Sequence, residues 1–142
     1  MAYNQSNTLK LTNFAKAEGK GNPFYDVVLE RLGGVNTAAS NTMIKYLLAN
    51  SDARIWTTYT QADDSTWTAK EQGDFGNRDI TFNNLAKPIS TFDMPIYLFT
   101  AHEVAFLQAE AMERFASGGG AKGMYDAGVL ASFSQHGMAD TA

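Results

Sequence analysis

The sequence contains no cysteine, and it has only two histidines among its 142 residues. Without cysteine the chain can form no disulfide, no thiolate metal site and no cysteine nucleophile. His102 and His136 stand far apart, and neither lies in a zinc-binding arrangement of the HExxH type. No motif for a nucleophilic serine is present, and GGGAKG at 118–123 lacks the GK[ST] ending of a phosphate loop. The residues therefore support no enzymatic activity, and we expect no catalytic residue, no metal and no cofactor.

Long apolar runs and basic clusters are missing as well. No stretch reaches the ~18 apolar residues that a membrane helix needs. Residues 1–21 are polar and show no signal-peptide core, so we expect this segment to lack signal and anchor. The 11 basic residues are scattered and the net charge is −4, which argues against nucleic acid as a partner. With 44% hydrophobic residues, the composition is that of a folded globular protein.

The first part of the chain shows two helical patterns after a polar start. Residues 1–22 are rich in Asn, Lys, Thr and Gly and predict a flexible arm or loop. Residues 24–32 predict a short helix or a buried turn that ends at Gly33-Gly34. Residues 37–50 predict a further helix, because four apolar residues recur at helical spacing: Met43, Ile44, Leu47 and Leu48.

The composition changes in residues 54–69, which are rich in Thr, Trp, Tyr and Ile. This composition favours two short strands, joined by a polar turn at 62–64. Strand alternation would place Trp56 on the opposite face from Tyr59. Residues 73–84 are rich in Gly and Asn and predict a loop.

The last part of the chain predicts a helical hairpin over residues 100–137. Thr100 and Glu103 form the pattern of a capping box at the start of a helix that runs to about Phe115. After a glycine-rich loop, a second helix is expected from about Gly120 to His136. The predicted apolar stripes are Val104, Leu107, Ala111 and Phe115 on the first helix, and Ala121, Tyr125, Val129 and Phe133 on the second. Two such helices cannot bury both apolar faces alone, so we expect them to stack on further helices.

Three aromatic residues, Trp56, Tyr59 and Trp67, are the candidate ligand-binding residues. An exposed aromatic ring offers a flat apolar surface that suits the face of a sugar ring. Trp67 is the first choice because it follows the polar turn, where Asp63 and Asp64, together with Asn77, could add polar contacts. The alternative is that all three rings pack in the core. A calcium site at the turn is not favoured, since the DxDxDG spacing is absent.

Several segments together resemble the SusD/RagB family. The segment PIYLFTAHEVAFLQAEAMERF at 95–115 fills that family's helix pattern EVxFLxAEA, and AKGMYDAGVLASFSQHG at 121–137 is similar to the helix that follows it. Upstream, NPFY at 22–25 and SDARIWTTYT at 51–60 resemble the family's Asn-Pro and Asp-Pro-Arg-Leu segments. Ala53 departs from the usual proline there.

The resemblance implies a mainly α fold with a tetratricopeptide-like helical hairpin and a small β- and loop-rich insertion. Residues 23–142 would form part of a SusD-like domain, with 51–95 as the loop-rich part and 100–137 as the hairpin. It also implies a cell-surface lipoprotein of the outer membrane that binds glycans and works with a SusC-like TonB-dependent β-barrel transporter. Members of the family are longer, so the chain is expected to be an internal segment.

Two alternatives remain open. The ligand could be a peptide rather than an oligosaccharide. The chain could also be a helical-hairpin module that binds a protein partner through its apolar helix faces, although such a module has no need of the aromatic, loop-rich segment 54–84. A hydrolase would need an acid pair that the sequence does not provide.

Overall fold

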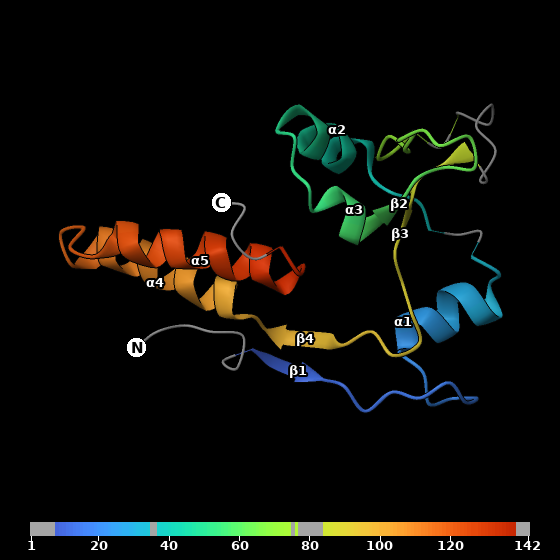
Figure 1. The fold of residues 1–142 in the computed structure, drawn as a ribbon, viewed down its shortest axis with the longest axis horizontal. Coiled ribbons are helices and arrows are strands. Elements are labelled where there is room, and N and C mark those ends of the chain that lie inside the picture. The colour runs from blue at the N-terminus through green and yellow to red at the C-terminus, as the bar shows by residue number, and fades with distance from the viewer. Residues whose placement is uncertain (1–7, 35–36, 75, 77–83, 139–142) are drawn as a thin grey trace. The chain divides into compact units, whose positions relative to one another are not determined.

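The computed structural model describes residues 8–34, 37–74, 76 and 84–138. The chain divides into two compact units, one formed by Met1–Asn13 with Pro95–Ala142 and the other by Phe14–Met94. Each unit is described by itself (Figure 1). Helices make up 44% of the residues and the strands are short, so the expectation of a mainly α fold is confirmed. Most of the predicted loop 73–84 lies outside the described residues.

The first unit contains the expected helical hairpin. Helix α4 (Ala101–Phe115) and helix α5 (Ala121–Gln135) lie side by side, joined by a tight loop (Figure 1). The capping box is confirmed. The Glu103 amide donates to the Thr100 hydroxyl at 3.3 Å, and the Thr100 amide donates to the Glu103 carboxylate at 2.9 Å. Because these bonds satisfy amides that the first turn leaves unpaired, they fix where α4 begins.

Small residues form the contact between the two helices. The buried residues of α4 are Ala101, Ala105 and Ala109, and those of α5 are Ala121, Gly128 and Ser132. Gly128 leaves room for the ring of Phe106, since a Cβ at that position would stand 2.7 Å from a ring carbon. The helices thus approach closely where their side chains are small.

The predicted apolar stripe of α4 is wrong as a description of the helix–helix contact, because Leu107 is 58% exposed and Phe115 is 85% exposed. The predicted stripe of α5 contributes in part. Ala121 is buried, and Tyr125, although 57% exposed, lies against Phe106 of α4 with ring centroids 5.5 Å apart. Helical spacing alone cannot distinguish the contact face of a helix from its other face when both carry apolar residues.

A two-stranded sheet completes the first unit. Strand β1 (Leu9–Leu11) pairs antiparallel with β4 (Ile96–Phe99), with Leu9 opposite Phe99 and a bulge before Lys10. The amide of Ala101, the first residue of α4, donates to the Thr8 hydroxyl at 3.1 Å. The predicted arm 1–22 thus contains a short strand, which its polar composition did not suggest.

The second unit begins with a continuous helical segment. Helix α1 (Pro23–Tyr25) continues into a π-helix, η2 (Asp26–Arg31). The Asn22 side chain caps α1 by accepting from the Phe24 amide at 2.9 Å. Beyond the segment, Gly33 and Gly34 have positive φ angles, which stop the helix where the sequence predicted. The position of this helix was predicted, but its π-type hydrogen bonding was not.

Helix α2 (Asn41–Ala49) begins later than the predicted 37–50. Ala39, just before the N-cap residue Ser40, is held in an extended segment. Its amide donates to the Ala86 carbonyl, and its carbonyl accepts from the Lys70 amide. Ile44 and Leu47 are buried as expected. The other two residues of the predicted stripe, Met43 and Leu48, are 47% and 46% exposed.

The prediction of two strands in residues 54–69 is wrong for most of that segment. Residues Ile55–Thr58 form a short helix, α3, and only β2 (Tyr59–Thr60) is a strand. Strand β2 pairs with β3 (Lys87–Pro88), not with residues 65–69. A buried cluster packs beneath these elements, made of Ala39, Ile44, Leu47, Ile55, Ala69 and Ala86.

Asp52 explains why a helix forms where the composition favours a strand. Its carboxylate accepts from the Arg54 amide at 3.0 Å and from the Arg54 guanidinium Nε at 2.9 Å. These bonds, together with donation from the Ile55 amide to the Asp52 carbonyl, fold residues 52–55 into a turn. The turn carries the chain into α3 and overrides the β propensity of Ile55, Trp56 and Thr57.

Among the described residues, none of the helices combines the length and the apolar character that crossing a membrane requires.

Candidate functional site

Two of the three predicted aromatic residues lie against each other. The rings of Trp56 and Trp67 have centroids 4.9 Å apart and an interplanar angle of 69°, an edge-to-face arrangement. Trp56 is 60% exposed, whereas Trp67 is half-buried and packs against the buried cluster. The structure therefore brings together an outward-facing indole and a second indole that supports it. We call this the tryptophan pair.

The position of Trp56 follows from its neighbours in α3. Ile55 is only 3% exposed and inserts into the buried cluster. Trp56 is the next residue of the same helix, so its ring points to a different side of α3 from Ile55. The Asp52–Arg54 ion pair holds the start of this turn, and its Asp52 side chain is 9% exposed. A partly buried, bidentate pair of this kind fixes geometry more firmly than an exposed one.

Trp67 is positioned by the turn that precedes it and by the segment that follows it. In the turn, the Asp64 carboxylate accepts from the Thr66 hydroxyl at 2.7 Å and from the Thr66 amide at 3.0 Å. These hydrogen bonds hold the pKa of Asp64 below its ordinary value. After Trp67, the Ala86 amide donates to the Thr68 carbonyl at 2.7 Å. Both flanks of Trp67 are therefore fixed, and the predicted polar turn is confirmed.

Tyr59 lies closer to the core than to the surface. It is half-buried, packs against the same cluster as Trp67, and stands opposite Pro88 in the β2–β3 pair. Burial raises the pKa of its phenol. Of the proposed polar contributors, Asp63 and Asp64 are exposed, while Asn77 lies outside the described residues.

Two carboxylates of α4, Glu103 and Glu110, have structural partners. Glu103 completes the capping box. The Glu110 side chain is 54% exposed and forms an ion pair with Arg114 at 2.7 Å, one turn further along α4. The two histidines lie at helix ends, and Nε2 of His102 stands 3.1 Å from the Thr100 hydroxyl. Among the described residues, no group of three or more His, Asp and Glu is arranged to hold a metal ion.

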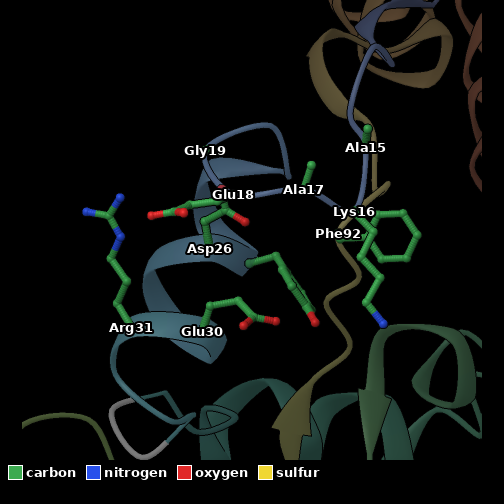
Figure 2. A pocket seen from close by; sticks show the side chains of 10 residues that line it. Ala15, Lys16, Ala17, Glu18, Gly19, Asp26, Glu30, Arg31 and Phe92 are labelled. Atoms are coloured by element: carbon green, nitrogen blue, oxygen red, sulfur yellow. The ribbon is translucent and has the colours of Figure 1, made fainter.

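The second unit also contains a cavity that the sequence did not predict. Its volume is about 420 Å³, and its walls come from residues 15–19, from α1 and η2, and from Phe92 (Figure 2). The Asn22-Pro23 turn was the one sign of this cavity in the sequence, because a turn before a helix brings the preceding segment close to the helix. The contribution of Phe92 could not be found in this way, since it lies about 70 residues further along the chain.

The tryptophan pair has the chemistry of a stacking surface. An exposed indole that is held from behind presents its apolar face with little loss of side-chain entropy on binding. Such a face suits the C–H groups of a sugar ring or the side chain of a peptide. The pair contains no nucleophile and no acid–base group, so it can bind but cannot catalyse.

Comparison with known proteins agrees with the fold. A family model described as "SusD-like: Susd and RagB outer membrane lipoprotein" matches residues 4–142. No curated protein matches this chain. A SusD homologue from Bacteroides vulgatus is 26% identical, with a TM-score of 0.76 over 97% of this chain and 28% of the homologue.

Two further solved structures are similar. A SusD homologue from Bacteroides uniformis is 21% identical, with a TM-score of 0.76 over 96% of this chain and 29% of the homologue. At this low identity the similarity shows a shared fold and no shared function. A SusD homologue from Bacteroides thetaiotaomicron is 30% identical, with a TM-score of 0.57 over 67% of this chain and 21% of the homologue. The chain thus spans less than a third of the length of these homologues.

Proposed function

This chain belongs to the SusD-like family of SusD and RagB outer-membrane lipoproteins, and on that premise we propose that it forms part of a cell-surface glycan-binding protein. The bound glycan would pass to a SusC-like TonB-dependent transporter, which is the proposed partner. Proteins of this family bind their ligands and are not enzymes. The lipid anchor and the outer-membrane location belong to the same proposal.

The observation that carries the proposal for this segment is the tryptophan pair. Trp56 is a large aromatic residue with 60% of its surface exposed, and Trp67 supports it at 4.9 Å. An indole that is mostly exposed contributes little burial to the core, whereas its flat apolar face suits a sugar ring. We propose Trp56 and Trp67 as the ligand-contacting residues, with Tyr59 completing the support from the side of the core.

A peptide ligand is the second candidate, and the open faces of the hairpin favour it. Leu107, Phe115 and Leu130 are all at least half exposed, and apolar residues at helical spacing are a common binding surface for peptide segments. The two candidates differ in location. Glycan binding would depend on the tryptophan pair in the second unit, and peptide binding on α4 and α5.

The test is direct binding by the full-length protein that contains this chain. An array of neutral oligosaccharides and a peptide library would be screened, and the best ligand of each kind titrated by calorimetry. We expect an oligosaccharide to bind, and we expect its affinity to fall about tenfold or more in Trp56→Ala, the loss of one stacked ring. Tyr46→Ala, which also removes an exposed aromatic ring, is the matched control.

Binding of peptides but of no oligosaccharide would overturn the glycan proposal. Unchanged oligosaccharide affinity in Trp56→Ala would move the site out of this segment. The proposed partner is tested separately, by asking whether the full-length protein co-purifies from outer membranes with a β-barrel transporter.

A further inference from the structure

The cavity beside α1 and η2 is a separate feature of the second unit. Residues 15–19 form one wall, and Tyr25, Asp26, Glu30 and Phe92 contribute to the others. A volume of about 420 Å³ falls within the range of small-ligand sites, ~300–1,000 Å³. At the lower end of that range, it has room for one or two sugar rings.

The walls of the cavity are fixed by Asn22, which is only 4% exposed. Its side-chain amide donates to the Met94 carbonyl at 2.7 Å, and its side-chain oxygen accepts from the Phe24 amide at 2.9 Å. Its backbone amide donates to the Phe92 carbonyl at 2.7 Å. One buried residue thus ties the helix to the chain segment that carries Phe92. The shape is therefore preorganised, which lowers the entropy cost of binding.

The loop over the cavity is closed by its own hydrogen bonds. The Ala15 amide donates to the Lys20 carbonyl at 2.8 Å, and the Lys20 amide donates to the Ala17 carbonyl at 2.9 Å. Gly19 allows this closure with a φ of +68°, a conformation that costs other residues energy. The loop backbone is thus a defined wall, from which the side chains at 15–18 extend.

Polar groups of both charges line the cavity around an aromatic part. Figure 2 shows Glu18, Asp26, Glu30 and Arg31 along the side of the helix, and Lys16 beside Phe92 along the other side. The rings of Tyr25 and Phe92 meet edge to face with centroids 6.4 Å apart. A hydrogen bond to the Glu30 carboxylate, more than burial, raises the pKa of the Tyr25 phenol.

We propose that this cavity binds a neutral, hydroxylated sugar residue of the glycan, as a subsite distinct from the tryptophan pair. Sugar hydroxyls both donate and accept, so they can bond to the carboxylates on one side and to Lys16 on the other. A charged ligand would meet a like charge on one of the two sides. The C–H face of the ring would lie against Tyr25 and Phe92. This inference rests on the proposed glycan function.

The test uses the full-length protein and the neutral methyl glycosides of glucose, galactose, mannose and N-acetylglucosamine. Their binding would be followed by saturation-transfer NMR, because a single sugar ring binds only at about millimolar affinity. We expect at least one of these glycosides to bind in wild-type protein and in Trp56→Ala alike. Ala17→Trp, which fills the cavity from its loop wall, should abolish the signal.

Tyr25→Phe provides a second variant that keeps the ring and removes only the hydroxyl. We expect it to weaken binding roughly three- to tenfold, the value of one hydrogen bond between neutral groups. Tyr46→Phe, an exposed tyrosine on α2, is the matched control and should leave binding unchanged. Thermal unfolding would verify that each variant is folded.

Wild-type glycoside binding in both folded variants, Ala17→Trp and Tyr25→Phe, would overturn the cavity proposal. Tighter binding of methyl glucuronide or glucosamine than of the neutral glycosides would also overturn it. If the oligosaccharides of the array bind while neither variant affects them, the subsite fails and glycan capture stands. If no oligosaccharide binds to the wild-type protein, the proposed function fails and the subsite fails with it.

Discussion

At the scale of single residues, the two tryptophans differ in exposure and in how much each contributes to the packing of the core. Trp56 extends from α3 and is 60% exposed, so few of its contacts contribute to folding. Trp67 packs against the cluster around Ile44 and Ile55. Both lie in one segment of the sequence, but their exposure depends on the turn that Asp52 and Arg54 build, which the composition does not report. Trp67, the first choice from the sequence, is the supporting ring of the pair.

This difference leads to opposite expectations for their alanine variants. Trp67→Ala should lower the free energy of unfolding by about 2 kcal/mol, since a half-buried indole leaves a cavity. Trp56→Ala should lower it by about 1 kcal/mol or less, since only the edge-to-face contact with Trp67 is lost, and should weaken oligosaccharide binding. Urea unfolding and calorimetric titration of the same samples measure both quantities. Equal destabilisation by the two variants, without a binding defect, would assign both rings to the core.

Two glycines of α5 are predicted to respond to alanine in opposite ways. At Gly128 a Cβ would stand 2.7 Å from the Phe106 ring, so Gly128→Ala should destabilise by about 1–3 kcal/mol through overpacking. At Gly123 a Cβ would meet nothing within 4 Å, so Gly123→Ala should stabilise by about 0.5–1 kcal/mol through the helix propensity of alanine. Thermal unfolding compares the two. A stabilising Gly128→Ala would contradict the close approach of α4 and α5.

At the scale of elements, the hairpin was predictable because its signals are local. The capping box needs only Thr100 and Glu103, and the loop between the helices contains three consecutive glycines at 118–120. The helix–helix contact was not predictable in the same way. It depends on alanine, glycine and serine approaching closely, and small residues carry a weak hydrophobic signal.

The second unit was harder to predict because distant residues decide its elements. Strand β2 pairs with β3, whose first residue is Lys87, and α2 begins late because Ala39 bonds to Lys70 and Ala86. The candidate binding residues were found from composition alone, since aromatic residues are conspicuous. Their contact with each other and the cavity near Asn22 depend on packing that no local pattern reports.

The capping box gives a prediction for the start of α4. Thr100→Ala should lower the free energy of unfolding by about 1 kcal/mol, since the Glu103 amide loses its acceptor. Thr100→Ser, which keeps the hydroxyl, should recover most of this loss. Both are measured by urea unfolding at neutral pH. An unchanged midpoint in Thr100→Ala would show that the cap does not limit the stability of α4.

The same box predicts a dependence on pH. Hydrogen bonds from the Thr100 hydroxyl, and then from its amide, hold the pKa of Glu103 below its ordinary value of 4.5. A carboxyl whose pKa is lower in the folded state stabilises that state when ionised. Its contribution is therefore present above pH 4.5 and is lost as the pH falls through the lower, folded-state pKa. The difference in unfolding free energy between wild type and Glu103→Gln should shrink over that acidic window, and a constant difference would contradict the assignment.

At the scale of the whole molecule, large apolar residues remain at the surface of the hairpin. Leu107, Phe115 and Leu130 are 58%, 85% and 50% exposed. Small residues already fill the contact between α4 and α5, so these side chains face outward from both helices. Helices of this kind form stable structures by stacking on neighbouring helices. The solved homologues are more than three times as long as the matched segment, which covers 28% of the first of them.

The exposed face predicts how residues 1–142 behave when produced alone. An uncovered apolar surface binds hydrophobic dyes and promotes association, so the isolated segment should bind anilinonaphthalene sulfonate and sediment as a concentration-dependent oligomer. The double variant Leu107→Gln and Phe115→Gln should reduce both effects while preserving the helix content, because neither side chain contributes to the α4–α5 contact. Val104→Gln with Gln108→Ala, which leaves Leu107 and Phe115 in place, serves as the comparison and should retain most of the dye binding. Circular dichroism, dye fluorescence and sedimentation velocity would be measured on the same preparations. A stable monomer without dye binding would show that the segment covers this face by itself, and the expectation that α4 and α5 need further helices would then be wrong.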